Sequence, residues 1–127
     1  MPNTNVVVVI EDDVDIRSLL AAILEPAGFT VHTAVDGLAG IEEVRRVDPV
    51  VTTLDVSMPG LDGFETARRI REFSDTSILM VSARVDATEE KLAREAGAAD
   101  YLTKPFRPRE LRARVQALVE RHLSDQG

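Results

Sequence analysis

Side chains that could bind a cation or a phosphoryl group follow four separate apolar runs of this sequence. They are Glu11, Asp12, Asp13, Asp55, Ser82 and Lys104. Acids suit a hard cation such as Mg2+, which takes carboxylate oxygens and keeps several of its waters. A carboxylate can also attack a phosphoryl group, while an ammonium and a hydroxyl can bind its oxygens. The set is therefore chemically complete for the phosphorylation of an aspartate.

Two other chemistries fit these residues less well. The loop after the first apolar run holds acids and no glycine, so it would repel a phosphate rather than cradle one. No second general base is in sight for hydrolysis, because His32 and His122 lie far apart and in no ligand-like spacing. Nucleotide or flavin binding and acid–base hydrolysis are both disfavoured.

The elements that must position these side chains alternate along the chain. Short apolar runs predict strands at 6–10, 29–34, 50–54, 77–81 and 100–102. Amphipathic stretches predict helices at 14–27, 36–49, 62–73, 86–98 and 108–123, with Asp13, Asp36 and Asp62 as N-caps. Such alternation predicts an α/β fold with a parallel sheet and helices on both faces. The run 29–34 alternates in polarity, so we expect it at an edge.

In a parallel sheet, ligands bind beyond the carboxyl ends of the strands. Each candidate residue alone is typical of an ordinary feature, since acids and serines after strands usually form turns or caps. All of them, however, follow the ends of different strands and would meet at one edge of the sheet. The joint placement therefore favours a functional site.

Composition limits the class of protein. With 127 residues the chain is one domain, 1–127, with an ordered core expected at about 5–123. The absence of cysteine excludes disulfides and thiolate sites. A net charge of −7 disfavours direct nucleic-acid binding, and no apolar run is long enough to span a membrane. We expect a cytoplasmic protein.

Four segments carry a resemblance to a known family. They read VVVVIEDD, TTLDVSMPGLDGFE, ILMVSA and GAADYLTKPF, in that order. Together they resemble the receiver domain of two-component response regulators, typified by CheY, over nearly the whole chain. The resemblance implies a flavodoxin-like (βα)5 three-layer sandwich with a parallel five-stranded sheet of order 2-1-3-4-5.

The resemblance also implies a function and its residues. Asp55 would accept a phosphoryl group from a sensor histidine kinase or phosphotransfer protein, with Mg2+ as cofactor and Mn2+ as a substitute. The metal ligands would be Glu11, Asp12, Asp55 and the backbone carbonyl of Ser57. Ser82 and Lys104 would contact the phosphoryl group, Ser82 and Tyr101 would form the switch, and the Lys104–Pro105 bond would be cis. Such a domain is not an enzyme beyond self-phosphorylation and autodephosphorylation.

The resemblance also implies which surface signals to a downstream partner, but it does not name that partner. Phosphorylation would change the surface of the fourth helix, fifth strand and fifth helix for an unidentified downstream effector. The stretch 107–122 resembles the last helix of receivers attached to winged-helix domains, whose dimers meet through this surface. Lys91, Arg94 and Ala99 depart from that pattern, so we expect a monomer or a weak phosphorylation-dependent dimer.

Two other functions remain as alternatives. An inactive receiver-like module would bind a partner without phosphorylation, although the intact set of acids, hydroxyl and lysine argues against it. A metal-dependent phosphohydrolase with an aspartyl intermediate is the second alternative, but in such an enzyme Lys104 would have no evident role. Among the three adjacent acids, Arg17 sets the register of the family pattern and selects Glu11 and Asp12 for the metal. Asp13 would then cap the first helix.

Overall fold

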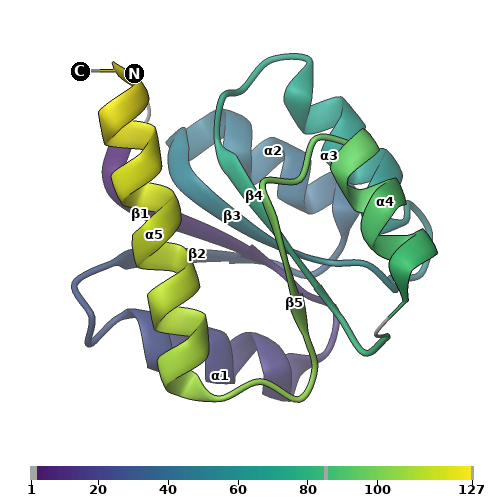
Figure 1. The fold of residues 1–127 in the computed structure, drawn as a ribbon, viewed down its shortest axis with the longest axis horizontal. Coiled ribbons are helices and arrows are strands. Elements are labelled where there is room, and N and C mark those ends of the chain that lie inside the picture. Colours follow the sequence, from purple (N-terminus) through teal and green to yellow (C-terminus); the bar gives the residue numbers. More distant parts are fainter. Residues whose placement is uncertain (1–2, 85, 127) are drawn as a thin grey trace.

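The computed structural model describes residues 3–84 and 86–126, in which five strands alternate with five helices (Figure 1). The strands are β1 (Asn3–Ile10), β2 (Thr30–Ala34), β3 (Pro49–Asp55), β4 (Ser77–Ser82) and β5 (Asp100–Thr103). The helices are α1 (Val14–Leu24), α2 (Gly37–Val47), α3 (Gly63–Arg71), α4 (Ala87–Glu95) and α5 (Pro108–Gln126). None of the described helices is long and apolar enough to cross a membrane.

The strands form one parallel sheet in the order β2-β1-β3-β4-β5, as predicted. The alternating strand β2 lies at an edge, and β3, which is buried along its whole length, lies at the centre. Because all strands run in the same direction, their carboxyl ends share one edge of the sheet. The residues that follow β1, β3 and β5 therefore meet there.

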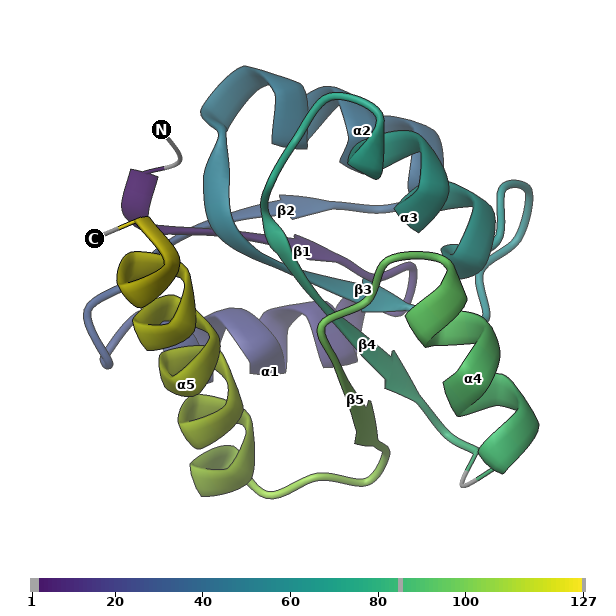
Figure 2. The same ribbon diagram turned by 45° about the horizontal axis from the view of Figure 1, so that its top comes forward.

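Helices cover both faces of the sheet (Figures 1 and 2). Side chains alternate along each strand, so β1 sends Val7 and Val9 to one face and Val8 and Ile10 to the other. The first face packs against α1 and α5, and the second against α2, α3 and α4. The result is the three-layer sandwich predicted from the sequence.

Aspartates cap four helices. The side chains of Asp13, Asp36, Asp62 and Asp86 accept backbone N–H groups in the first turns of α1, α2, α3 and α4. A carboxylate at this position satisfies free N–H groups and interacts favourably with the helix dipole. The predicted caps Asp13, Asp36 and Asp62 are confirmed.

Several element ends differ from the prediction. Helix α1 ends at Leu24 rather than at 27, because Pro26 has no N–H to continue the helical hydrogen bonds. Helix α4 ends at Glu95, and Gly97 follows with a φ of 103° that favours glycine. Strand β1 begins at Asn3 rather than at 6, since the Asn3 N–H donates to Asp48 O.

One arginine ties together loops at the opposite edge of the sheet. The Arg71 guanidinium donates to the carbonyls of Ser74 (3.0 Å), Gly97 (3.1 Å) and Thr76. The planar fork of arginine suits several acceptors at once. Arg71 thus joins the end of α3 to the loop that follows α4.

Two neighbouring threonines of β3 have different hydrogen bonding. Thr52 Oγ1 lies 3.0 Å from Thr76 Oγ1 in the core, so these two hydroxyls satisfy each other. Thr53 Oγ1 is buried and has no hydrogen-bond partner among the described residues. A buried hydroxyl without a partner costs free energy because it has lost its hydrogen bonds to water.

We expect the two threonines to respond in opposite ways to the same substitution. Thr53→Val removes an unsatisfied hydroxyl and should raise the free energy of unfolding by about 1 kcal/mol. Thr52→Val leaves the Thr76 hydroxyl buried without Thr52 and should lower it by about 1–2 kcal/mol. Urea unfolding followed by circular dichroism measures both. A loss of stability in Thr53→Val equal to that in Thr52→Val would contradict this assignment.

Candidate functional site

Three carboxylates gather at the carboxyl edge of the sheet. Glu11 and Asp12 follow β1, and Asp55 ends β3. One carboxylate oxygen from each lies within 4.8 Å of the others. Glu11 is 1% exposed and Asp55 6% exposed, whereas Asp12 faces solvent. Three oxygen donors with one open, solvent-facing side fit a hard cation such as Mg2+, which keeps several waters.

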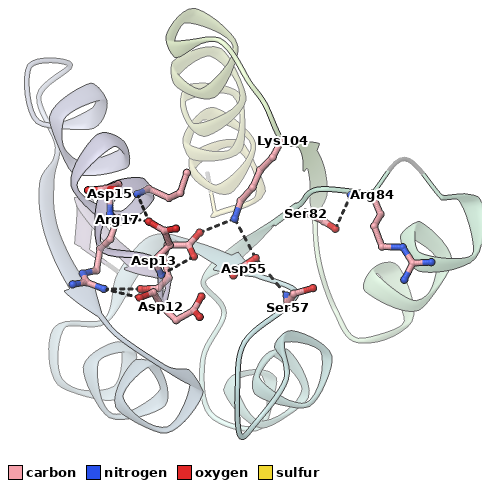
Figure 3. Close-up of polar contacts among 11 residues, drawn as sticks. Asp12, Asp13, Asp15, Arg17, Asp55, Ser57, Ser82, Arg84 and Lys104 are labelled. Carbon is pink, nitrogen blue, oxygen red and sulfur yellow. Dashed lines mark hydrogen bonds and ion pairs between the residues drawn. The ribbon is translucent and has the colours of Figure 1, made fainter.

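Lys104 enters this cluster from the end of β5 (Figure 3). Its Nζ lies 3.0 Å from Glu11 Oε1 and 3.4 Å from Asp55 Oδ1. The Lys104 backbone N–H donates to Ser82 O, and the Lys104–Pro105 bond is cis, as the resemblance implied. The structure therefore brings together residues from the ends of β1, β3 and β5.

The site has more buried negative charge than positive charge. Burial, followed by the nearby Glu11 carboxylate, raises the pKa of Asp55 to about 7, although Lys104 acts against this shift. Burial alone would lower the pKa of Lys104, but Glu11 and Asp55 outweigh it and raise the pKa of the lysine. A single lysine does not fully offset the two buried acids. A bound cation would complete the balance of charge.

The loop after β1 is held in register by its own side chains. Arg17 donates to the backbone carbonyls of Glu11 (3.0 Å) and Asp12 (3.5 Å). Asp13 Oδ1 accepts the N–H groups of Asp15 (2.8 Å) and Ile16 (3.1 Å) as the cap of α1. Figure 3 shows Asp13 engaged with this first turn. Of the three adjacent acids, Glu11 and Asp12 belong to the carboxylate cluster.

Helix α3 begins directly against the strand end that carries Asp55. A Cβ at Gly63 would lie 2.6 Å from Asp55 O and 2.8 Å from Val56 Cα, so only glycine allows this approach. The Gly63 N–H donates to Val56 O at 3.1 Å. Ser57, in the intervening loop, donates its N–H to Asp55 Oδ1 at 3.4 Å. The role of Gly63 was missed from the sequence, where it read only as part of a helix start.

Ser82 and Tyr101 meet at a residue that the sequence analysis did not single out. The Ser82 hydroxyl donates to Glu89 Oε1 and accepts the Arg84 N–H (3.2 Å). The Tyr101 hydroxyl lies 2.6 Å from the same Glu89 oxygen and 2.9 Å from Arg84 O. Figure 3 shows Ser82 beside Arg84. A signal for Glu89 exists in the sequence, since it lies one helical turn before Ala93, a buried residue of α4.

Comparison with known proteins identifies the family of this chain. The family model of the response regulator receiver domain matches residues 7–116. The transcriptional regulatory protein CseB of Streptomyces coelicolor is 44% identical over 115 residues, which are 91% of this chain and 49% of CseB. The DNA-binding response regulator MtrA of Mycobacterium tuberculosis H37Rv is 35% identical over 116 residues, which are 91% and 51% of the two chains.

The fold is shared with solved receiver domains. A CheY-like response regulator receiver domain protein from Methanospirillum hungatei superimposes with a TM-score of 0.91 at 20% identity, over 95% of this chain and 98% of that one. This chain spans about half the length of the curated relatives named above. The family match covers most of the chain, and the acidic cluster lies at the edge where the family resemblance placed it. The chain belongs to the response regulator receiver domain family, the phosphoacceptor signalling domain of two-component systems.

Proposed function

We propose that Asp55 accepts a phosphoryl group from a phosphohistidine of a sensor histidine kinase or phosphotransfer protein, in a reaction that needs Mg2+. The observation that carries this proposal is the buried Asp55 carboxylate, which lies in one cluster with Glu11 and Asp12 and within 3.4 Å of Lys104 Nζ. We also propose that residues 1–127 form a single receiver domain, since the family model covers residues 7–116.

In this reaction the residues of the chain bind and position the phosphoryl group. An Asp55 oxygen attacks phosphorus, the P–N bond of the phosphohistidine breaks, and its electron pair stays on that nitrogen. The imidazole leaves as a neutral ring, because its other nitrogen carries the proton. Lys104 neutralises a phosphoryl oxygen as a point charge, and Ser82 donates a hydrogen bond to another. Mg2+, or Mn2+ in its place, would be held by Glu11, Asp12, Asp55 and the Ser57 carbonyl and would supply further charge neutralisation.

An apolar hollow beside the site offers a place for the phosphodonor. It has a volume of about 290 Å3 and is lined by Ile16, Leu19, Ala83, Lys104, Pro105 and Phe106. Apolar side chains of a partner helix would bury surface there while its phosphohistidine faces Asp55. Lys104 lines this hollow and also contacts Asp55, so a protein bound in the hollow would lie next to the phosphoacceptor. This supports a protein as the phosphodonor.

The proposal predicts a strict requirement for Asp55. Wild-type protein should bind beryllofluoride in the presence of Mg2+ and react with acetyl phosphate, whereas Asp55→Asn should do neither, because an amide neither attacks phosphorus nor coordinates beryllium. Calorimetry and mass spectrometry measure the two outcomes. Equal binding by wild type and Asp55→Asn would favour an interaction module that works without phosphorylation. Steady turnover of a generic phosphate ester would favour a phosphohydrolase.

Substitution of the two neighbouring acids Asp12 and Asp13 should have different effects on Mg2+ binding. Asp12→Ala should abolish Mg2+ binding measured by calorimetry, because it removes an oxygen of the carboxylate cluster. Asp13→Ala should keep Mg2+ binding and lower the free energy of unfolding by about 1 kcal/mol, since it removes the cap of α1. Asp13→Asn is the matched control, because asparagine caps helices as well as aspartate does. Equal loss of Mg2+ affinity in Asp12→Ala and Asp13→Ala would overturn this division.

The output surface formed by α4, β5 and α5 is charged and paired within the chain. Lys91 and Arg94 are exposed on α4, and Arg94 pairs with Glu90 at 3.1 Å. Arg114 of α5 pairs with Asp100 of β5 at 2.9 Å. Arginine and acid groups already paired within one chain leave less charge for pairing with a second copy.

We therefore expect this domain to stay monomeric on activation. Gel filtration with light scattering should give the same mass with and without beryllofluoride and Mg2+. A dimer that forms only with beryllofluoride would contradict this prediction and would assign the α4–β5–α5 surface to self-association.

A further inference from the structure

Glu89 is a buried acid that neither the metal cluster nor the phosphoacceptor explains. It is 8% exposed and projects from the first turns of α4 toward β4 and β5. Three groups contact its carboxylate: the Ser82 hydroxyl and the Tyr101 hydroxyl at Oε1, and Arg84 Nε at 3.5 Å from Oε2. An acid that is this buried requires such partners, because an unpaired buried charge is costly.

The contact with Ser82 conflicts with the proposed role of that residue. A serine hydroxyl has a single proton to donate. That proton is directed to Glu89, while the oxygen accepts the Arg84 N–H at 3.2 Å. Ser82 can donate to a phosphoryl oxygen on Asp55 only after it leaves Glu89. The carboxylate and the phosphoryl group therefore compete for one proton.

The contact with Tyr101 gives this competition a second consequence. Ser82 and Tyr101 share a single oxygen, Glu89 Oε1, in the structure. When Ser82 leaves, the phenol keeps that oxygen alone, and its hydrogen bond to the carboxylate becomes stronger. The ring is then held more firmly where it lies in this structure, with its hydroxyl also in contact with Arg84 O.

We propose that Glu89 is the positioning residue that couples the two switch residues: it holds Ser82 away from the phosphoacceptor, and the departure of Ser82 strengthens its hold on Tyr101. This inference rests on the proposed phosphorylation of Asp55 and adds a specific competitor to it. Glu89 touches neither the reacting atoms nor the metal cluster, so it acts through Ser82 and Tyr101.

The electrostatics of Tyr101 agree with this contact. Burial, and then the hydrogen bond to Glu89, raise the pKa of Tyr101 to about 12. Tyr101 is the single tyrosine of the chain, and the chain has no tryptophan. Tyrosine absorbance and fluorescence therefore report on this ring alone.

The first test is the affinity for beryllofluoride with Mg2+, measured by calorimetry. Glu89→Gln weakens the competing hydrogen bond and should tighten binding by about five- to tenfold, because a hydrogen bond to a charged acceptor is worth more than one to a neutral acceptor. Glu90→Gln is the matched control, since it removes the same charge from the next residue of α4, which pairs with Arg94 instead. It should bind as wild type does.

A double-mutant cycle separates this coupling from a general effect of charge. In a Ser82→Ala background there is no hydroxyl for Glu89 to hold, so Glu89→Gln should no longer tighten binding. Equal or weaker affinity of Glu89→Gln relative to wild type would overturn the inference, as would a gain that persists with Ser82→Ala. Failure of wild type itself to bind beryllofluoride would remove the proposed function as well.

The second test follows the ring. Beryllofluoride should change the tyrosine fluorescence of wild type and of Glu90→Gln, but the change should be largely lost in Glu89→Gln. Alkaline titration of tyrosinate absorbance should show a lower pKa for Tyr101 in Glu89→Gln than in Glu90→Gln. A fluorescence response in Glu89→Gln equal to that of wild type would show that Ser82 and Tyr101 are not coupled through this carboxylate.

Discussion

Two buried carboxylates share one lysine at the carboxyl edge of the sheet, and the rest of the molecule is arranged around that imbalance of charge. Glu11 directly follows β1 and Asp55 ends the neighbouring parallel strand β3, so the fold holds them close together whatever their protonation state. Lys104 contacts both and offsets only part of their repulsion. A site with surplus buried negative charge favours a cation, and with it the arrival of an anionic phosphoryl group.

The surrounding residues keep this arrangement in place. Arg17 binds the backbone carbonyls of the loop that carries the acids, so its cation supports their position without occupying the site. Gly63 lets α3 begin in contact with the Asp55 carbonyl, and this contact fixes the end of β3. The acidic loop thus depends on α1, and Asp55 depends on α3. The starts of α1 and α3 therefore help to set the geometry of the site.

Alternation and cap chemistry are local signals, and they predicted the parallel sheet, the caps and the residues at the strand ends. The order of the strands came from the family resemblance. Sequence reasoning missed Glu89, since an acid in an amphipathic helix reads as solvated unless its contacts with β4 and β5 are known. It missed the close approach at Gly63 and the unsatisfied Thr53 hydroxyl for the same reason. The contacts of these residues depend on distances between segments far apart in the chain. The spacing of Glu89 and Ala93 could place Glu89 on the buried face of α4, but it could not identify Ser82 and Tyr101 as its partners.

The three-way contact of Arg71 has a mechanical meaning for α4. This arginine donates to the carbonyl of Gly97, two residues after the end of α4, and to the carbonyls of Ser74 and Thr76 in the α3–β4 loop. The opposite end of α4 rests on the side-chain contacts of Glu89 with Ser82 and Tyr101. The C-terminal end of α4 is thus held by hydrogen bonds to main-chain carbonyls. Its first turn is held by hydrogen bonds from side-chain hydroxyls, which can change partner. The position of the first turn of α4 therefore depends on the partners that the Ser82 and Tyr101 hydroxyls choose, whereas its C-terminal end is fixed to main-chain atoms.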